Sequence, residues 1–235
     1  MNVKDGFAMK FAVDNGYKIG IISGGTNESV RKRLNGLGIE EIHLKSHDKI
    51  VPFNNFLSKY KSVYDVFLDN WGYQNHFVAY LESLMRQETL LPTHIKEMIF
   101  AYVSGLNGCG YCKNIHAEIS KKILRDKNDQ DFMNDIEQSQ IEEKYKPILK
   151  LSHKVNEDIH SITEEDVTAI LDYGFDEKVI SEIISICSTA QFMNTVVVAH
   201  QIKPLDQVQN VASAKMMIEK GYDGLAEFML RRRNK

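Results

Sequence analysis

Two thiols, an imidazole and a carboxylate occur within twenty positions of the chain, at Glu97, Cys109, Cys112 and His116. Side chains three or four positions apart share one face of a helix, so Cys109, Cys112 and His116 are expected to lie together. A thiol becomes a good nucleophile only when it ionises, and a helix N-terminus favours the thiolate. The spacing therefore predicts nucleophilic or redox chemistry at an activated cysteine.

The local elements explain how these four residues can meet. We expect a helix to begin near Cys109, which places this thiol in the first turn, where its pKa should be lowered. His116 lies within reach of Cys112 and can take its proton. Glu97 belongs to the preceding helix, and residues 105–108 break the two helices apart. Folded back across this break, Glu97 can orient His116 or pass protons to it, as in activated-nucleophile catalysis.

The rest of the chain shows two patterns that change near Lys61. Before it, β-branched runs at 17–23 and 39–44 flank a helix capped by Asn27, which predicts a β-α-β unit. After it, apolar residues recur at helical spacing. Helices are expected over residues 73–87, 92–105, 109–124, 145–155, 163–173 and 179–190. We predict a mainly α protein: a short, incomplete α/β segment at 1–61, a helical domain at 62–210, and a C-terminal helix with a basic tail at 211–235.

The composition excludes several classes of protein. Of the 235 residues, 43% are hydrophobic and 26% charged, which is typical of a folded globular chain. A net charge of −3 gives no support for nucleic-acid binding. No apolar run approaches the roughly 20 residues that span a bilayer, and no signal peptide is evident, so we expect a cytoplasmic protein without membrane contact. Three cysteines do not make a disulfide scaffold.

The motif Glu97, then Cys109-x-x-Cys112-x-x-x-His116, resembles the signature of AhpD-like alkylhydroperoxidases in the carboxymuconolactone decarboxylase superfamily. The surrounding segments, at residues 91–112 and 190–194, are similar to its peroxidase-related branch, and the likeness covers about 63–203. This resemblance implies an all-helical, homo-oligomeric protein without a cofactor. One departure concerns the proton relay, because Tyr111 stands where well-studied members carry a second histidine.

The resemblance also implies an activity, that of a thiol-dependent peroxidase. Cys112 would be the peroxidatic cysteine and Cys109 the resolving one. Cys112 would attack a hydroperoxide and become a sulfenic acid, which Cys109 converts to a disulfide. An external dithiol, lipoyl or thioredoxin-type, would then reduce that disulfide. With His116 and Glu97, these residues form the expected catalytic set.

Other interpretations of the cysteines stay open at this point. A structural zinc site needs four ligands, and the sequence offers no second CxxC pair. The cysteines can also be core thiols without function, which is our expectation for Cys187 on its apolar helical stripe. The main alternative to an enzyme is a catalytically inactive helical oligomer that acts as a binding module. Decarboxylase or lactone chemistry is disfavoured because that branch does not generally need a dithiol.

Residues 1–61 resemble a fragment of 3-deoxy-D-manno-octulosonate 8-phosphate phosphatase, in the haloacid dehalogenase superfamily. The resemblance implies phosphate-holding roles for Ser23, Gly24 and Lys49. However, the DxD motif that supplies the nucleophile and the later acidic magnesium ligands are missing from this chain. We therefore expect no phosphatase activity, and a role in docking or oligomerisation or none at all.

Overall fold

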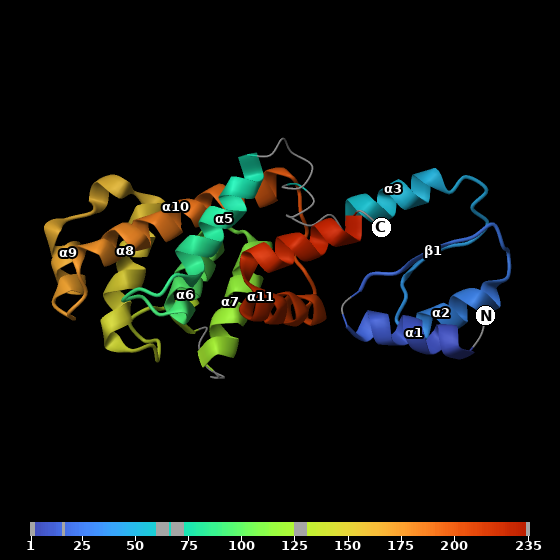
Figure 1. Ribbon diagram of the computed structural model, residues 1–235, viewed down its shortest axis with the longest axis horizontal. Helices are drawn as coiled ribbons and strands as arrows, with labels where there is room; N and C mark the ends of the chain where they lie inside the picture. The colour runs from blue at the N-terminus through green and yellow to red at the C-terminus, as the bar shows by residue number, and fades with distance from the viewer. Residues whose placement is uncertain (1–2, 16, 60–65, 67–72, 125–130, 234–235) are drawn as a thin grey trace.

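A computed structural model describes residues 3–15, 17–59, 66, 73–124 and 131–233. The protein is mainly α-helical, and its N-terminal unit lies at one end, beyond α11 (Figure 1). The elements run in this order: α1 Val3–Asp14, β1 Gly20–Ile22, α2 Glu28–Asn35, β2 Glu41–His43, α3 Ile50–Lys59, α5 Tyr73–Arg86, α6 Thr93–Leu106, α7 Gly110–Leu124, α8 Lys146–Glu157, α9 Glu164–Leu171, α10 Glu177–Ala199 and α11 Gln207–Arg233. Short 3₁₀ turns lie at Asp131–Met133, Glu143–Tyr145 and Ile159–Ser161.

The N-terminal unit contains the predicted β-α-β arrangement. Strands β1 and β2 pair in parallel, with Ile21 opposite Ile42. The predicted cap of α2 is confirmed, since Asn27 Oδ1 accepts a hydrogen bond from the Ser29 backbone at 3.0 Å. A small core forms around Leu34 and is separate from the core of the helical body. The expected join near 61–65 lies outside the described residues.

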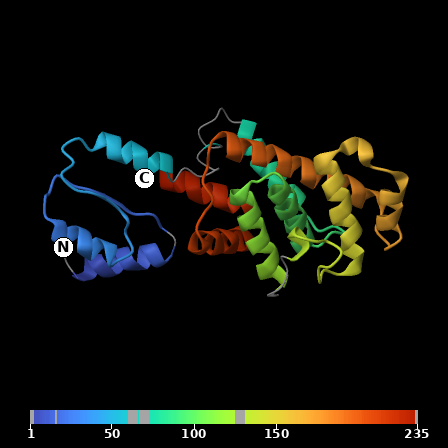
Figure 2. The same ribbon diagram turned by 180° about the vertical axis from the view of Figure 1, so that it is seen from behind.

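The helical body is built around α6. All residues of this helix from Ile95 to Ser104 are buried, because α7, α8 and α10 pack on it. Pro92 precedes its first turn, as the sequence predicts. α6 and α7 form a tight antiparallel pair, and the first half of α11 packs across α7 (Figure 2). The central position of α6 fixes Glu97 deep inside the body.

The later helices begin at side chains that cap them. Thr163 and Asp166 form a capping box at the start of α9. At the start of α10, the Asp176 carboxylate accepts hydrogen bonds from two backbone N–H groups. α10 is long and apolar enough to cross a membrane, judged by length and composition alone. However, it packs against α6 and α8, as the core helix of a globular body does.

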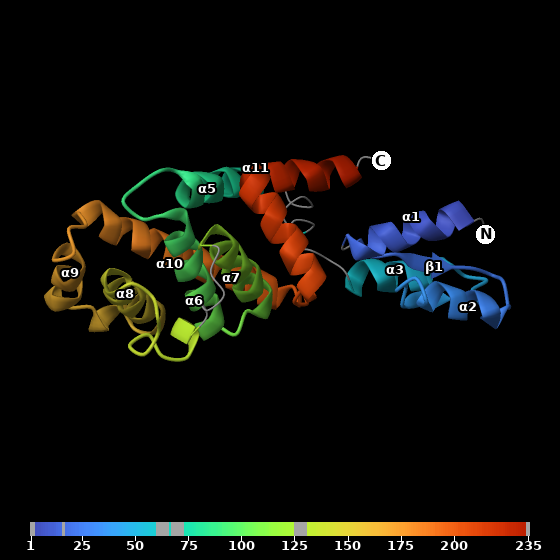
Figure 3. The same ribbon diagram turned by 90° about the horizontal axis from the view of Figure 1, so that it is seen from below.

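The last helix does not form a separate C-terminal unit. The expected boundary at residue 210 falls inside α11, and Ala214, Met217 and Tyr222 belong to the core of the helical body. Gly221, with φ 70° and ψ −175°, interrupts the helical backbone. Figure 3 shows the two segments of α11 meeting at an angle near α5. After the kink, the second segment runs from near α5 toward the C-terminus, and Tyr222 at its start packs into the core of the helical body.

Candidate active site

The loop between α6 and α7 places the two cysteines at the start of α7. Gly108 adopts a left-handed conformation, with φ 65°, and lets the chain reverse between the helices. Cys109 directly precedes α7, and its carbonyl accepts the Lys113 N–H at 3.0 Å, as an N-cap residue does. Cys112 lies in the first turn. Both thiols are buried and unoxidised.

A hydrogen bond between the two thiols gives them different pKa values. The pKa of Cys109 is lowered to about 7, mainly because the Cys112 thiol donates a hydrogen bond to its sulfur; burial works against this shift. Backbone N–H groups of Cys112 and Tyr111 lower the pKa further, which is the predicted effect of the helix N-terminus. Conversely, the pKa of Cys112 is raised well above its usual value by the same hydrogen bond and by burial. Of the two thiols, Cys109 is therefore the one that ionises more readily.

This difference in pKa qualifies the sequence-based expectation. The resemblance assigns the attacking role to Cys112, whereas Cys109 is the thiol that ionises more readily. However, Cys112 lines a pocket that Cys109 does not. Moving the shared proton from Cys112 to Cys109 would put the thiolate at the pocket wall.

Glu97 and His116 form a buried pair, as the spacing suggested. The Glu97 carboxylate is fully buried and accepts a hydrogen bond from His116 Nδ1 at 2.6 Å. Because an ionised carboxylate can only accept, Nδ1 carries a proton and Nε2 is left for the pocket that His116 lines. The His116 ring stacks on Phe100, with centroids 3.8 Å apart, which fixes its plane.

Burial alone would raise the pKa of Glu97, but the charges and hydrogen bonds of His116 and Arg86 outweigh it and lower the pKa. Arg86 donates to Glu97 Oε1 at 2.6 Å, and the Tyr222 hydroxyl donates to the same oxygen at 2.9 Å. The carboxylate is thus ionised and held by three donors. Arg86 and Tyr222 come from α5 and α11, and sequence spacing alone did not reveal them.

Two asparagine side chains form a hydrogen-bonded chain that reaches the Cys109 thiol. Asn194, buried on α10, donates to Ser104 Oγ at 2.9 Å and accepts from Asn107 at 3.0 Å. Its side chain also hydrogen-bonds to Cys109 and lowers the pKa of that thiol. An asparagine on an otherwise apolar helix face was the available signal for this role, since buried polar groups need partners.

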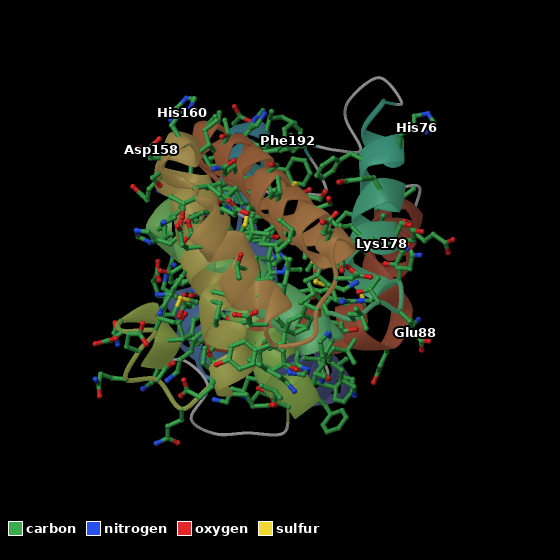
Figure 4. The ribbon with its side chains drawn as sticks, turned by 90° about the vertical axis from the view of Figure 1, so that its left-hand side faces the viewer. His76, Glu88, Asp158, His160, Lys178 and Phe192 are labelled. Atoms are coloured by element: carbon green, nitrogen blue, oxygen red, sulfur yellow. The ribbon has the colours of Figure 1, made fainter. Side chains whose placement is uncertain are left out.

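The pocket beside Cys112 and His116 is almost entirely apolar and measures about 460 Å³ including its opening. It lies between α5, α6, α7, α10 and α11. Its walls are formed by these residues: Phe77, Val78, Leu81, Phe100, Tyr111, Cys112, Ile115, His116, Met193, Met217 and Tyr222. At its rim, Phe77 contacts Phe192, with ring centroids 4.7 Å apart, and Figure 4 shows Phe192 between α10 and α5.

The other candidate residues lie elsewhere. Cys187 is fully buried, and burial raises its pKa to about 12, which is consistent with the expected core role. Ser23 and Gly24 follow β1 in the N-terminal unit, and Lys49 directly precedes α3. Within the described ranges, no cluster of three or more potential metal ligands occurs.

Comparison with known proteins supports the fold. No protein-family model matches the sequence, and no curated protein matches it. The structure resembles the alkylhydroperoxidase AhpD core of an uncharacterized peroxidase-related protein from Ralstonia eutropha JMP134, with a TM-score of 0.56 and 22% identity over 60% of this chain and 75% of that one. It also resembles an uncharacterized peroxidase-related protein from Silicibacter sp. TM1040, with a TM-score of 0.59 and 20% identity over 69% of this chain and 87% of that one. The helical body therefore has the AhpD-like all-helical fold.

Proposed function

We propose that this protein is a thiol-dependent peroxidase, a dithiol–disulfide oxidoreductase that reduces hydroperoxides. The observation that carries the proposal is a single pocket lined by both Cys112 and His116. Behind it, Cys109 accepts a hydrogen bond from the Cys112 thiol, which lowers the pKa of Cys109, and Glu97 holds the imidazole by Nδ1. A nucleophile, a proton carrier and an orienting carboxylate are thus arranged around one apolar space.

The reaction can be written with all atoms and electrons balanced. Transfer of the shared proton to Cys109 leaves a thiolate on Cys112, which attacks the terminal oxygen of ROOH and breaks the O–O bond. His116, which takes up at Nε2 the proton released when the cysteine pair ionises, donates it to the departing alkoxide and yields ROH. The Cys112 sulfenic acid then reacts with Cys109, whose proton leaves with the hydroxyl group as water. Two thiols and ROOH become a disulfide, ROH and H2O.

The pocket lining favours an organic hydroperoxide. Its walls are aromatic and aliphatic side chains, which stabilise an apolar R group and offer few partners to a small polar oxidant. We therefore expect an aromatic hydroperoxide such as cumene hydroperoxide to react faster than hydrogen peroxide.

Return to the dithiol state needs an external reductant. Thiol–disulfide exchange with a lipoyl or thioredoxin-type dithiol supplies two electrons and restores both thiols. This partner, and assembly into a homo-oligomer, belong to the proposal through the sequence resemblance.

The test is single-turnover oxidation of the reduced protein by cumene hydroperoxide. Intact and peptide mass spectrometry would follow formation of the Cys109–Cys112 disulfide. We expect Cys112→Ser to abolish turnover, His116→Ala to slow it, and Cys187→Ser to behave like wild type. Unchanged peroxide consumption in Cys112→Ser would refute the proposed site. A wild-type protein that consumes no peroxide would instead favour the catalytically inactive binding module.

A further inference from the structure

The second segment of α11 contributes a side chain to the Glu97–His116 pair. The Tyr222 hydroxyl lies 2.9 Å from Glu97 Oε1, 3.2 Å from Oε2 and 3.4 Å from His116 Nδ1. Tyr222 is 1% exposed and also lines the pocket. Its hydroxyl therefore sits in the angle between the carboxylate and the imidazole, on the side away from Nε2.

The kink in α11 places this tyrosine. At Gly221 the backbone leaves the helical region, and a Cβ atom there would collide with the Glu82 carboxylate. The Glu82 carboxylate occupies this space and accepts the Tyr222 backbone N–H at 2.6 Å. Three features thus fix the direction in which Tyr222 enters the body: the helix break, the glycine without a side chain, and the carboxylate from α5.

Arg86 binds the same assembly from α5. Its guanidinium lies 4.8 Å above the Tyr222 ring and donates to Glu97 Oε1 at 2.6 Å. Of the three hydrogen-bond donors to Glu97, only His116 takes part in proton transfer in the proposed reaction. The other two keep their protons throughout. The static donors withdraw electron density from the carboxylate and weaken its attraction for a protonated imidazole.

We propose that Tyr222 is a positioning residue that, together with Arg86, limits the proton affinity of the Glu97–His116 pair. The C-terminal segment of α11 is then part of the active site. The catalytic role inferred for Tyr222 rests on the proposed function, whereas the hydrogen bonds from which it is inferred do not. The charged or titratable groups around the pair are these: Arg86 and Glu82 on α5, Cys112 and the neighbouring Cys109 at the start of α7, and Tyr222 on α11.

The expected direction follows from the hydrogen bonds. In Tyr222→Phe the ring stays and one donor to Glu97 is lost, so the carboxylate attracts the imidazolium more strongly. Hydrogen bonds to charged groups are strong enough that proton binding at His116 should tighten about threefold to tenfold, a shift of roughly 0.5–1 pH unit to higher pH.

The experiment is ¹⁵N NMR titration of the histidine rings in the reduced full-length protein, with the His116 signal assigned by its loss in His116→Gln. Tyr102→Phe is the matched control. Tyr102 is also buried, and its hydroxyl bonds a histidine, His153 Nδ1 at 3.2 Å, outside the site. A second variant carries 3-fluorotyrosine at position 222, which keeps the ring and makes the hydroxyl a stronger donor.

We expect the His116 midpoint to rise in Tyr222→Phe, to fall with 3-fluorotyrosine and to stay constant in Tyr102→Phe. Equal midpoints in all four proteins, or equal shifts in both phenylalanine variants, would overturn the inference. If Tyr222→Phe does not fold, the fluorotyrosine protein alone decides, and an unchanged or raised midpoint in it overturns the inference. Because the titration uses no peroxide, a protein that fails to reduce peroxides refutes the proposed function and leaves this result standing.

Discussion

Replacing Cys112 by alanine tests the proton sharing between the two cysteines. The thiol of Cys112 is the largest cause of the low pKa of Cys109, about 7 against an ordinary 9.0. The variant removes this donor and keeps the backbone N–H groups and Asn194. At pH 7 a group with that pKa is half ionised. If the lost hydrogen bond moves the pKa by ~1 unit, about a tenth of Cys109 remains thiolate, and alkylation slows about fivefold.

The assay is alkylation by iodoacetamide across a pH series, with the modified residue identified by peptide mass spectrometry. Cys112→Ser is the matched control, because its hydroxyl can still donate to the Cys109 sulfur. We expect Cys109 in this control to titrate close to the wild-type value and Cys109 in Cys112→Ala to titrate at higher pH. Identical titrations of the two variants, or faster labelling of Cys112 than of Cys109 in wild type, would show that our assignment of the lower pKa to Cys109 is wrong.

Three further predictions concern stability and the remaining thiol. Glu97→Gln should lower the free energy of unfolding at pH 7 by about 3–5 kcal/mol, because it leaves the largely buried guanidinium of Arg86 without its carboxylate partner. Since the pKa of Glu97 is depressed in the fold, its stabilisation is present above the unfolded-state value and is lost as pH falls, so urea melts of variant and wild type should converge in acid. Gly221→Ala should destabilise by more than ~1–2 kcal/mol, because φ 70° with ψ −175° is a conformation essentially restricted to glycine and a Cβ there would also meet the Glu82 carboxylate, whereas Gly174→Ala, with φ 84° and open space, should show only the ~1–2 kcal/mol strain of a positive φ. An equal cost would argue against the Glu82 clash. Cys187→Ala should leave the alkylation profile near pH 7 unchanged, and loss of the reactive thiol would contradict its core role.

The parts of the site that are close in the chain were predictable. Helical spacing alone places Cys109, Cys112 and His116 on one face, and the two-helix hairpin brings Glu97 to His116 across 19 positions. The helices themselves follow from apolar periodicity, with caps such as Asn27 marking their ends. These features depend on local geometry, which a sequence expresses directly.

The parts that depend on packing were not predictable. Arg86 and Tyr222 meet Glu97 only because α5 and α11 cross the same end of α6 and α7, and no local pattern encodes that crossing. The lower pKa of Cys109 was also hidden, because spacing gives the proximity of two thiols but not which one donates the hydrogen bond. The C-terminal helix predicted at 211–235 corresponds to α11, Gln207–Arg233, but no local pattern showed that Met217 and Tyr222 pack into the core of the helical body.

The contact between Tyr222 and Glu97 spans 125 positions, whereas His116 and Glu97 are separated by 19. Contacts that close long loops cost more chain entropy and tend to form later in folding. The α6–α7 hairpin can therefore bring both thiols and the histidine together before α11 docks. A partly folded chain would already hold the two thiols and His116 together, while the Glu97 carboxylate would still lack the hydrogen bond from Tyr222. Hydrogen exchange should accordingly find α11 opening more readily than the α6–α7 hairpin, so that loosening this helix changes the chemistry of the dithiol before it unfolds the body.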